Sequence, residues 1–153
     1  MEESVDQVWM KKAIDLAEKG LFSTTPNPRV GCVIIKNNVL VGEGWHKKAG
    51  RPHAEIMALK MAGKKAKGAT LYTNLEPCSH QGQTGPCADQ IIKAGLSRVV
   101  CGMSDPNPRV DGTGKKKLEQ AGISVQMDVL NKEAVNLNLG FVKRMKYGKV
   151  KEK

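Results

Sequence analysis

Two cysteines in the segment EPCSHQGQTGPC, Cys78 and Cys87, are separated by eight mostly small or polar residues. Such surroundings offer a thiol little apolar packing. Upstream, the segment HAE places His53 two positions before Glu55. One imidazole and two thiolates form a ligand set that suits zinc, and three protein ligands leave the fourth position open for water. The pattern therefore predicts an open zinc site held by His53, Cys78 and Cys87.

Glu55 is the residue beside this predicted site that could move a proton. Zinc lowers the pKa of water to about 7, so a neighbouring carboxylate can take the proton and pass it to a leaving nitrogen. The order H-x-E, Pro-Cys and a second Cys is the signature of zinc deaminases. That signature has two residues between its cysteines, whereas this chain has eight. We therefore predict that Glu55 is the catalytic residue of a zinc hydrolase that releases an amino group.

Two other interpretations remain open at this stage. His80 could supply a fourth ligand, which would make the site a closed structural zinc site in a module that only binds partners. The net charge of +10 also fits a deaminase that acts on nucleic acid. Most of the basic residues are lysines, however, and two Trp, two Tyr and two Phe offer little surface for base stacking. Nucleic acid is therefore the less favoured partner, and an anionic small molecule fits the charge equally well.

The elements that must position these residues alternate between helix and strand. Apolar residues at helical spacing after Ser4, and β-branched runs such as VGCVII, set the pattern, and Asn37-Asn38 predicts a hairpin turn. The arrangement predicts an α/β sandwich with a five-stranded mixed sheet and helices on both faces. The predicted helices are 5–20, 53–61, 88–95, 114–122 and 131–145, the last capped by Asn131, and the predicted strands are 30–35, 39–47, 70–75, 98–103 and 123–129.

The spacing of His53 and Glu55 limits where the site can lie. Residues two positions apart do not share a side of a helix, so a site that uses both must lie beyond the N-terminal end of the helix. Cys87 follows Pro86 at the start of the next predicted helix. Helix N-termini carry partial positive charge and stabilise thiolates. We therefore expect the metal beyond the N-terminal end of the His53 helix, and either cysteine could lie near a positive helix terminus.

Length and composition favour a single domain. The chain has 153 residues, of which 40% are hydrophobic and 26% charged. It has no apolar run of the roughly 20 residues that a membrane span needs, and its acidic N-terminus lacks a secretory profile. We predict a cytoplasmic location, a deaminase domain over 1–145 and a loose basic tail over 146–153. Cys32 and Cys101 lie in apolar runs and are predicted to be core residues.

The long cysteine loop resembles one family in particular, the deaminase domain of the bifunctional riboflavin-biosynthesis deaminase/reductase. Further similar segments are NPRVGCVI, GEGWH, HAEIMAL, DPNPRVDGTG and NLNLGF, so the resemblance covers residues 5 to 142. It implies a cytidine-deaminase-like three-layer α/β/α sandwich. It also implies hydrolysis of 2,5-diamino-6-(5-phosphoribosylamino)pyrimidin-4(3H)-one to 5-amino-6-(5-phosphoribosylamino)uracil and ammonia. A tRNA-adenosine deaminase, or another nucleoside or base deaminase of the same fold, is the alternative.

The same resemblance implies residues and partners beyond the metal site. We expect one zinc per protomer and a homo-oligomer, most simply a dimer. We expect no NADPH, because no reductase domain follows in this sequence. A separate reductase polypeptide would then carry out the next step. The chain departs from the family pattern at Gln83, where a basic residue is usual, and at Gly85, where Pro is usual. The implied substrate contacts are Asn27, His46, His80, Asp105 and Asn107, of which the two asparagines lie in the repeated segment PNPRV, at 26–30 and 106–110.

Overall fold

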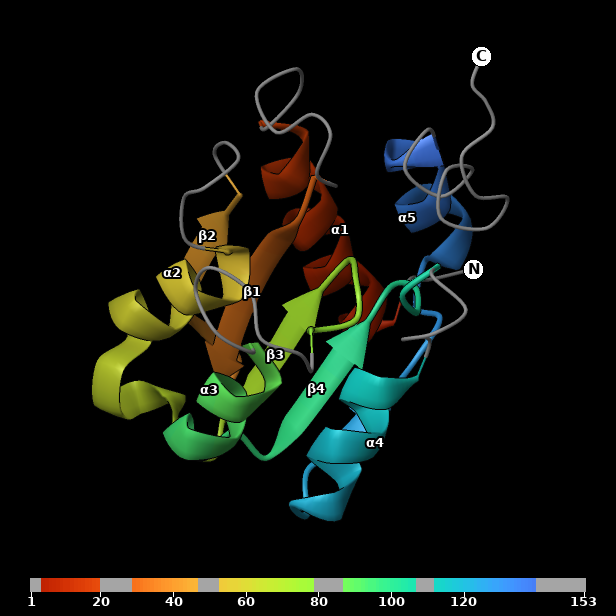
Figure 1. Cartoon of the computed structure of the whole chain (residues 1–153). Coiled ribbons are helices and arrows are strands. Elements are labelled where there is room, and N and C mark those ends of the chain that lie inside the picture. Colours follow the sequence, from red (N-terminus) through yellow and green to blue (C-terminus); the bar gives the residue numbers. More distant parts are fainter. Residues whose placement is uncertain (1–3, 20–28, 47–52, 79–86, 107–111, 140–153) are drawn as a thin grey trace.

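A computed structural model of the chain describes residues 4–19, 29–46, 53–78, 87–106 and 112–139 (Figure 1). The chain begins with a helix and a β-hairpin, after which helices and strands alternate, in the predicted order. The helices are α1 (Val5–Glu18), α2 (Ala54–Ala62), the short 3-10 helix η1 (Gly63–Ala66), α3 (Cys87–Ala94), α4 (Thr113–Gln120) and α5 (Asn131–Leu137). The strands are β1 (Gly31–Lys36), β2 (Val39–Trp45), β3 (Thr70–Thr73), β4 (Arg98–Cys101) and β5 (Ser124–Gln126).

The five strands form one mixed sheet in the order β2-β1-β3-β4-β5. Strand β1 is antiparallel to both β2 and β3, whereas β3, β4 and β5 run parallel to one another. Asn37 and Asn38 connect β1 to β2 with φ angles of 51° and 64°, the left-handed conformation that a two-residue hairpin turn requires. The predicted hairpin and the predicted mixed sheet are therefore confirmed.

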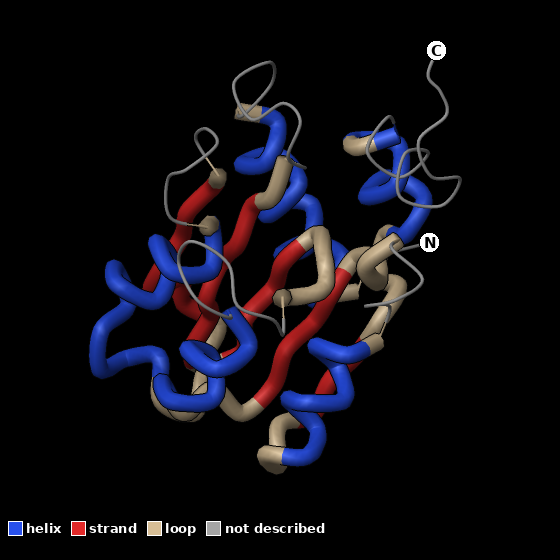
Figure 2. Tube along the Cα trace, in the orientation of Figure 1, coloured by secondary structure: helices blue, strands red, loops and turns tan. Residues whose placement is uncertain are grey.

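Helices cover both faces of this sheet and give the molecule three layers (Figure 2). Alternate residues of each strand point to opposite faces, so the sheet divides the core into two clusters. One cluster joins α1 and the end of α5 to the sheet through Met10, Ala13, Val33, Tyr72, Val100 and Leu137. The other joins α2, α3 and α4 to the opposite face through Ile34, Ala58, Leu71, Ile91, Val99 and Leu118.

Helix α2 lies unusually close to strand β2, because the strand carries Gly42 and Gly44 where the helix crosses it. A Cβ atom on Gly42 would lie 2.4 Å from the carbonyl oxygen of Ala58, and one on Gly44 would lie 2.8 Å from that of Ala54. No side chain fits at these distances. The close approach fixes the N-terminal end of α2 against the sheet, and this end carries His53 and Glu55.

The C-terminal elements differ from the sequence-based prediction. Strand β5 pairs over only three residues, and α5 begins after Leu130, the N-cap residue, at φ 56°. The prediction that Asn131 caps this helix is therefore wrong; its side-chain amide instead donates to the carbonyl of Gly102 and to Asp128. Residues 140–145, included in the predicted helix, lie outside the described residues. Among the described helices, none is long and apolar enough to cross a membrane.

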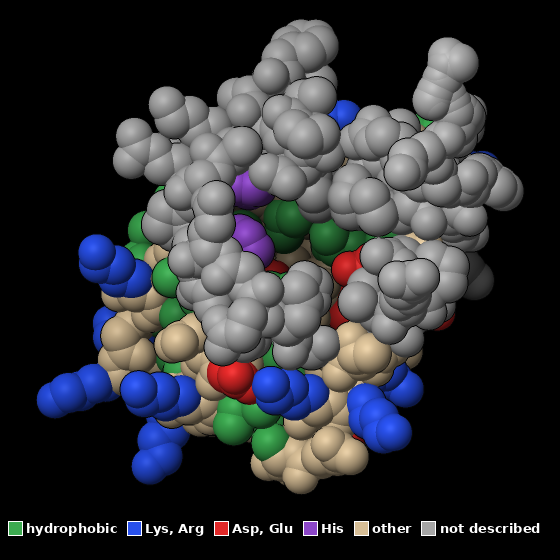
Figure 3. Space-filling view, in the orientation of Figure 1, with side chains coloured by type: hydrophobic (Ala, Val, Ile, Leu, Met, Phe, Trp, Pro, Cys, Tyr) green, Lys and Arg blue, Asp and Glu red, His purple; other side chains and the backbone are tan. Residues whose placement is uncertain are grey.

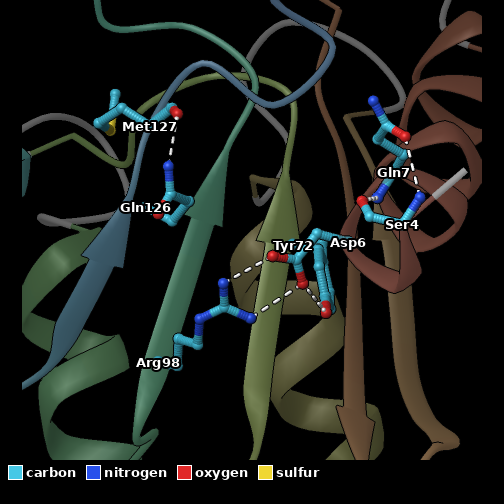
Figure 4. Close-up of polar contacts among 7 residues, drawn as sticks. All are labelled: Ser4, Asp6, Gln7, Tyr72, Arg98, Gln126 and Met127. Atoms are coloured by element: carbon cyan, nitrogen blue, oxygen red, sulfur yellow. Dashed lines mark hydrogen bonds and ion pairs between the residues drawn. The ribbon is translucent and has the colours of Figure 1, made fainter.

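An ion pair ties α1 to the sheet on the face opposite α2 and α3 (Figure 4). Arg98 on β4 donates to both carboxylate oxygens of Asp6, at 2.9 and 2.6 Å, and the Tyr72 hydroxyl donates to the same carboxylate at 2.8 Å. These contacts hold the first turn of α1, which begins with the predicted Ser4 cap. The hydrogen bond from Arg98, opposed by partial burial, lowers the pKa of Asp6.

Replacing Asp6 with Asn is expected to lower the free energy of unfolding at pH 7 by about 1–3 kcal/mol, because Arg98 loses its charged acceptor. A carboxyl group with a lowered folded-state pKa stabilises the fold above its unfolded-state pKa and loses this contribution as the pH falls through the folded value. The difference between wild type and Asp6→Asn should therefore shrink below about pH 4. Urea unfolding at pH 7 and pH 3 measures the difference in the free energy of unfolding between the two proteins. An equal difference at both pH values would contradict a stabilising role of the Asp6–Arg98 ion pair.

Candidate metal and active site

The three predicted metal ligands come together at the N-terminal ends of two helices. His53 is the N-cap of α2 and has an extended backbone (φ −68°, ψ 160°), while Cys87 is the first residue of α3. Cys78 lies five residues beyond the end of β3. The Nδ1 atom of His53 lies 3.1 Å from the Sγ atom of Cys87, and the ligand atoms of all three residues lie within 4.8 Å of one another.

This donor set fits a tetrahedral zinc ion. Zn–N bonds of about 2.0–2.1 Å and Zn–S bonds of about 2.3 Å place ligand atoms roughly 3.5–3.8 Å apart. The observed separations lie around that range, so little movement is needed for all three atoms to reach one ion. Among the described residues, His53, Cys78 and Cys87 are the one group of potential ligands found clustered in this way.

The protein stabilises negative charge on Cys78 before any ion binds. The backbone N–H of Cys87 donates to the Cys78 sulfur at 3.1 Å, and the N–H of Ala88 donates to the Cys78 carbonyl at 2.9 Å. A hydrogen bond from the Cys87 thiol, aided by one from His53, lowers the pKa of Cys78. Hydrogen bonding to the Cys78 sulfur also raises the pKa of His53. Zinc binding would release the remaining thiol proton, because only deprotonated thiols and neutral imidazole coordinate the ion.

Glu55 is the second residue of α2, two positions after the His53 N-cap, and it is 4% exposed. Burial raises the pKa of Glu55 from 4.5 to about 7, although the nearby His53 opposes the shift. Since His53 precedes the helix in an extended conformation, the two side chains can approach the same site despite their spacing of two. A carboxyl group that titrates near neutral pH suits a group that accepts and then donates a proton.

The raised pKa of Glu55 should make the stability of the metal-free protein depend on pH. Its folded form holds a proton that the unfolded form loses, so stability falls as the pH rises from about 4.5 towards 7. Replacing Glu55 with Gln removes the cost of ionising a buried carboxyl group. The metal-free Glu55→Gln protein should therefore be about 1–3 kcal/mol more stable than the metal-free wild type at pH 8, with little difference at pH 4.5. Thermal unfolding in chelator at both pH values checks this; a variant less stable at pH 8 would contradict it.

The predicted substrate-binding residues divide into two groups. His46, which is 5% exposed, lies beside the predicted ligand His53, with ring centroids 5.5 Å apart and the ring planes at 57° to each other. Histidine side chains line a hollow on this face of the molecule (Figure 3). Asp105 follows β4, and its N–H donates to Glu76. Outside the described residues lie Asn27, His80 and Asn107, together with Gln83 and Gly85. Cys32 and Cys101 are fully buried in the core cluster that contains Ala58, as predicted.

Sequence reasoning missed two buried polar residues that organise the surroundings of the site. Asn74, fully buried, accepts from the Gly31 N–H at 2.8 Å and donates to the Arg29 carbonyl at 3.0 Å. Glu76 accepts three backbone N–H groups. Both lie in TNLEPC, where polar residues continue a buried strand towards Cys78. A polar side chain in such a position must find internal partners, and this was the available signal.

The fold and the site together define a class of protein. Residues 3–103 match the family described as the cytidine and deoxycytidylate deaminase zinc-binding region. The chain belongs to this family and has a cytidine-deaminase-like fold, and its residues His53, Cys78 and Cys87 could hold the zinc ion that the family's description names.

Individual relatives are more specific. The chain is 57% identical over 143 residues to the riboflavin biosynthesis protein RibD of Escherichia coli (strain K12), a match covering 94% of this chain and 39% of that protein. It is 54% identical to the diaminohydroxyphosphoribosylamino-pyrimidine deaminase of Buchnera aphidicola subsp. Acyrthosiphon pisum (strain APS), covering 94% of this chain and 97% of that protein. The structure of Acinetobacter baumannii RibD superposes with a TM-score of 0.91 at 53% identity, covering 94% of this chain and 40% of that one. The chain thus spans about two fifths of the length of the RibD relatives.

Proposed function

We propose that this protein hydrolyses 2,5-diamino-6-(5-phosphoribosylamino)pyrimidin-4(3H)-one to 5-amino-6-(5-phosphoribosylamino)uracil and ammonia. One water is consumed: the bond between ring carbon C2 and its amino nitrogen breaks, and a carbonyl replaces it. The observation that carries this reaction type is the buried Glu55 carboxyl group, whose electrostatic neighbours are the clustered residues His53, Cys78 and Cys87.

The roles of the residues follow from their positions. His53, Cys78 and Cys87 would hold zinc, which, when bound, supplies a Lewis acid that makes water acidic near neutral pH. Glu55, in its ionised form, would take one proton from the attacking water and donate it to the departing amino nitrogen, so that ammonia leaves as a neutral molecule. The second water proton would pass to the ring nitrogen next to C2 as the carbonyl forms. Burial of Glu55 keeps bulk water from competing for this proton and supports the transfer.

The choice of substrate is supported by the relatives. The Buchnera deaminase has nearly the same extent as this chain, and its name specifies the diaminopyrimidine. RibD relatives, named for riboflavin biosynthesis, share the same region within longer chains. A deaminase-only relative fits the expectation that a separate reductase polypeptide acts on the product, without a nicotinamide cofactor on this chain. A homodimer in the cytoplasm completes this proposal.

Substrate contacts are proposed at Asn27, His46, His80, Asp105 and Asn107. His46 is supported most directly, because its ring lies next to that of His53. Asp105 is supported by its attachment to Glu76, two residues before Cys78. A phosphorylated substrate also agrees with the net charge of +10.

A substrate panel tests the proposal. The zinc-loaded protein would be incubated separately with the diaminopyrimidine phosphate, cytidine, deoxycytidylate and a tRNA anticodon stem-loop, and released ammonia would be measured with and without a chelator. We expect ammonia from the diaminopyrimidine alone, and only without chelator. Activity on the stem-loop that falls steeply with salt would instead identify a nucleic-acid deaminase, because phosphate-backbone contacts release counterions.

A further inference from the structure

Glu76 is a buried acidic residue to which the proposed reaction assigns no role. Its side chain lies in the segment between β3 and Cys78 and is 4% exposed. One carboxylate oxygen accepts the backbone N–H groups of Asp105, at 2.9 Å, and Gly112, at 3.1 Å; the other accepts that of Lys115 at 3.0 Å. Both oxygens are therefore used to bind the backbone.

These three N–H groups belong to two structures, the segment after β4 and the start of α4. Asp105 follows β4, while Gly112 and Lys115 are the N-cap and the third residue of α4. Gly112 has no side chain to cap the helix, and no side-chain cap bond occurs there. Glu76 supplies the missing acceptor from a neighbouring segment, and its negative charge faces the positive end of the helix.

The same contacts connect this region to the metal ligand Cys78. The N–H of Glu76 donates to the carbonyl of Met103 at 2.9 Å, which continues the pairing of β3 with β4. The start of α4 lies directly against Pro77: a Cβ atom on Gly114 would be 2.1 Å from the Pro77 carbonyl oxygen. Glu76 thus fastens Asp105 and the start of α4 to the backbone two residues before Cys78.

We propose that Glu76 is a positioning residue that sets where Asp105 and the N-terminus of α4 lie relative to the metal ligands. This inference rests on the proposed function for its kinetic consequence. Among the described residues, the hydrogen bonds of the Glu76 carboxylate go to these three backbone N–H groups. Glu76 therefore governs how the substrate is held and leaves proton transfer and zinc binding to other residues.

Glu76→Gln is the variant that tests this role with little change of shape. One oxygen becomes an NH₂ group, so at least one backbone N–H faces a donor in place of an acceptor. We expect KM for the diaminopyrimidine to rise about tenfold, with kcat within about threefold and zinc content unchanged. Glu119→Gln, an exposed glutamate on α4, is the matched control and should leave KM unchanged. Asp6→Asn, on the opposite face of the sheet, controls for a general loss of stability and should also leave KM unchanged.

Amide hydrogen exchange provides a readout that needs no substrate. The N–H groups of Asp105, Gly112 and Lys115 should exchange at least about tenfold faster in Glu76→Gln than in the wild type, while those of Val99 and Val100 in β4 keep their rates. Unchanged exchange at the three amides, or an activity loss that only follows loss of zinc, would overturn the inference. A wild-type protein that is inactive on the diaminopyrimidine would instead refute the proposed function, and the exchange experiment would still decide the role of Glu76.

Discussion

Replacing Glu55 with Gln is expected to lower the deamination rate by about 10²–10⁴-fold, because the amide cannot take up and return a proton. Zinc content should stay at one per protomer, since the clustered ligand atoms come from His53, Cys78 and Cys87. The buried position of Glu55 also accepts an amide of the same shape, so the variant should remain folded. Steady-state ammonia release and metal analysis of the same preparation measure both quantities.

The matched control is Glu133→Gln on helix α5, where the side chain is exposed. This variant removes the same charge and should keep full activity. If Glu55→Gln deaminates as fast as the wild type while holding zinc, another group must move the proton, or the metal site is structural and the activity lies elsewhere.

Removing a thiolate should have the second large effect. Mutating a residue that hydrogen-bonds to a metal ligand typically lowers metal affinity by about 10–100-fold, and removing a ligand itself should lower it further. We therefore expect Cys87→Ala to bind zinc more than about 100-fold more weakly than the wild type and to lose measurable deamination. Competition with a chromogenic chelator measures the affinity, and the activity assay is run at matched zinc concentrations.

Cys101→Ala is the control for this variant. Cys101 is also fully buried, but it lies in β4 and outside the ligand cluster. Its truncation is expected to reduce stability by about 1–3 kcal/mol and to leave zinc affinity unchanged. Equal zinc affinities of Cys87→Ala and the wild type would show that Cys87 is not a ligand.

The sequence predicted those features that are determined by neighbouring residues, such as helix ends and a hairpin turn. The side chain of Ser4 caps α1, Asn37-Asn38 forms the hairpin turn, and Gly95 follows α3 with φ 82°. The spacing of His53 and Glu55 predicted a site beyond a helix N-terminus, and His53 lies at the N-cap of α2. The ligand cluster, the fold class and the membership of the deaminase family are confirmed.

Features that depend on contacts between distant segments were not predictable in this way. Strand β5, at the sheet edge, pairs with β4 over only three residues, although its alternating pattern runs for seven residues. Leu130 takes the N-cap position of α5, where Asn131 is the stronger local candidate, because Asn131 bonds to Gly102 across the fold. Glu76 and Asn74 were missed since their partners are 29 to 45 residues away in the sequence.

The metal coordination is the most direct test of the account as a whole. A crystal structure of the zinc-loaded protein, with anomalous data collected on both sides of the zinc absorption edge, locates the ion and its ligands. We predict one ion bound by His53 Nδ1, Cys78 Sγ and Cys87 Sγ, with a water as fourth ligand within hydrogen-bonding distance of Glu55. A fourth protein ligand such as His80 in place of the water, or a Glu55 carboxylate turned away from the ion, would contradict it.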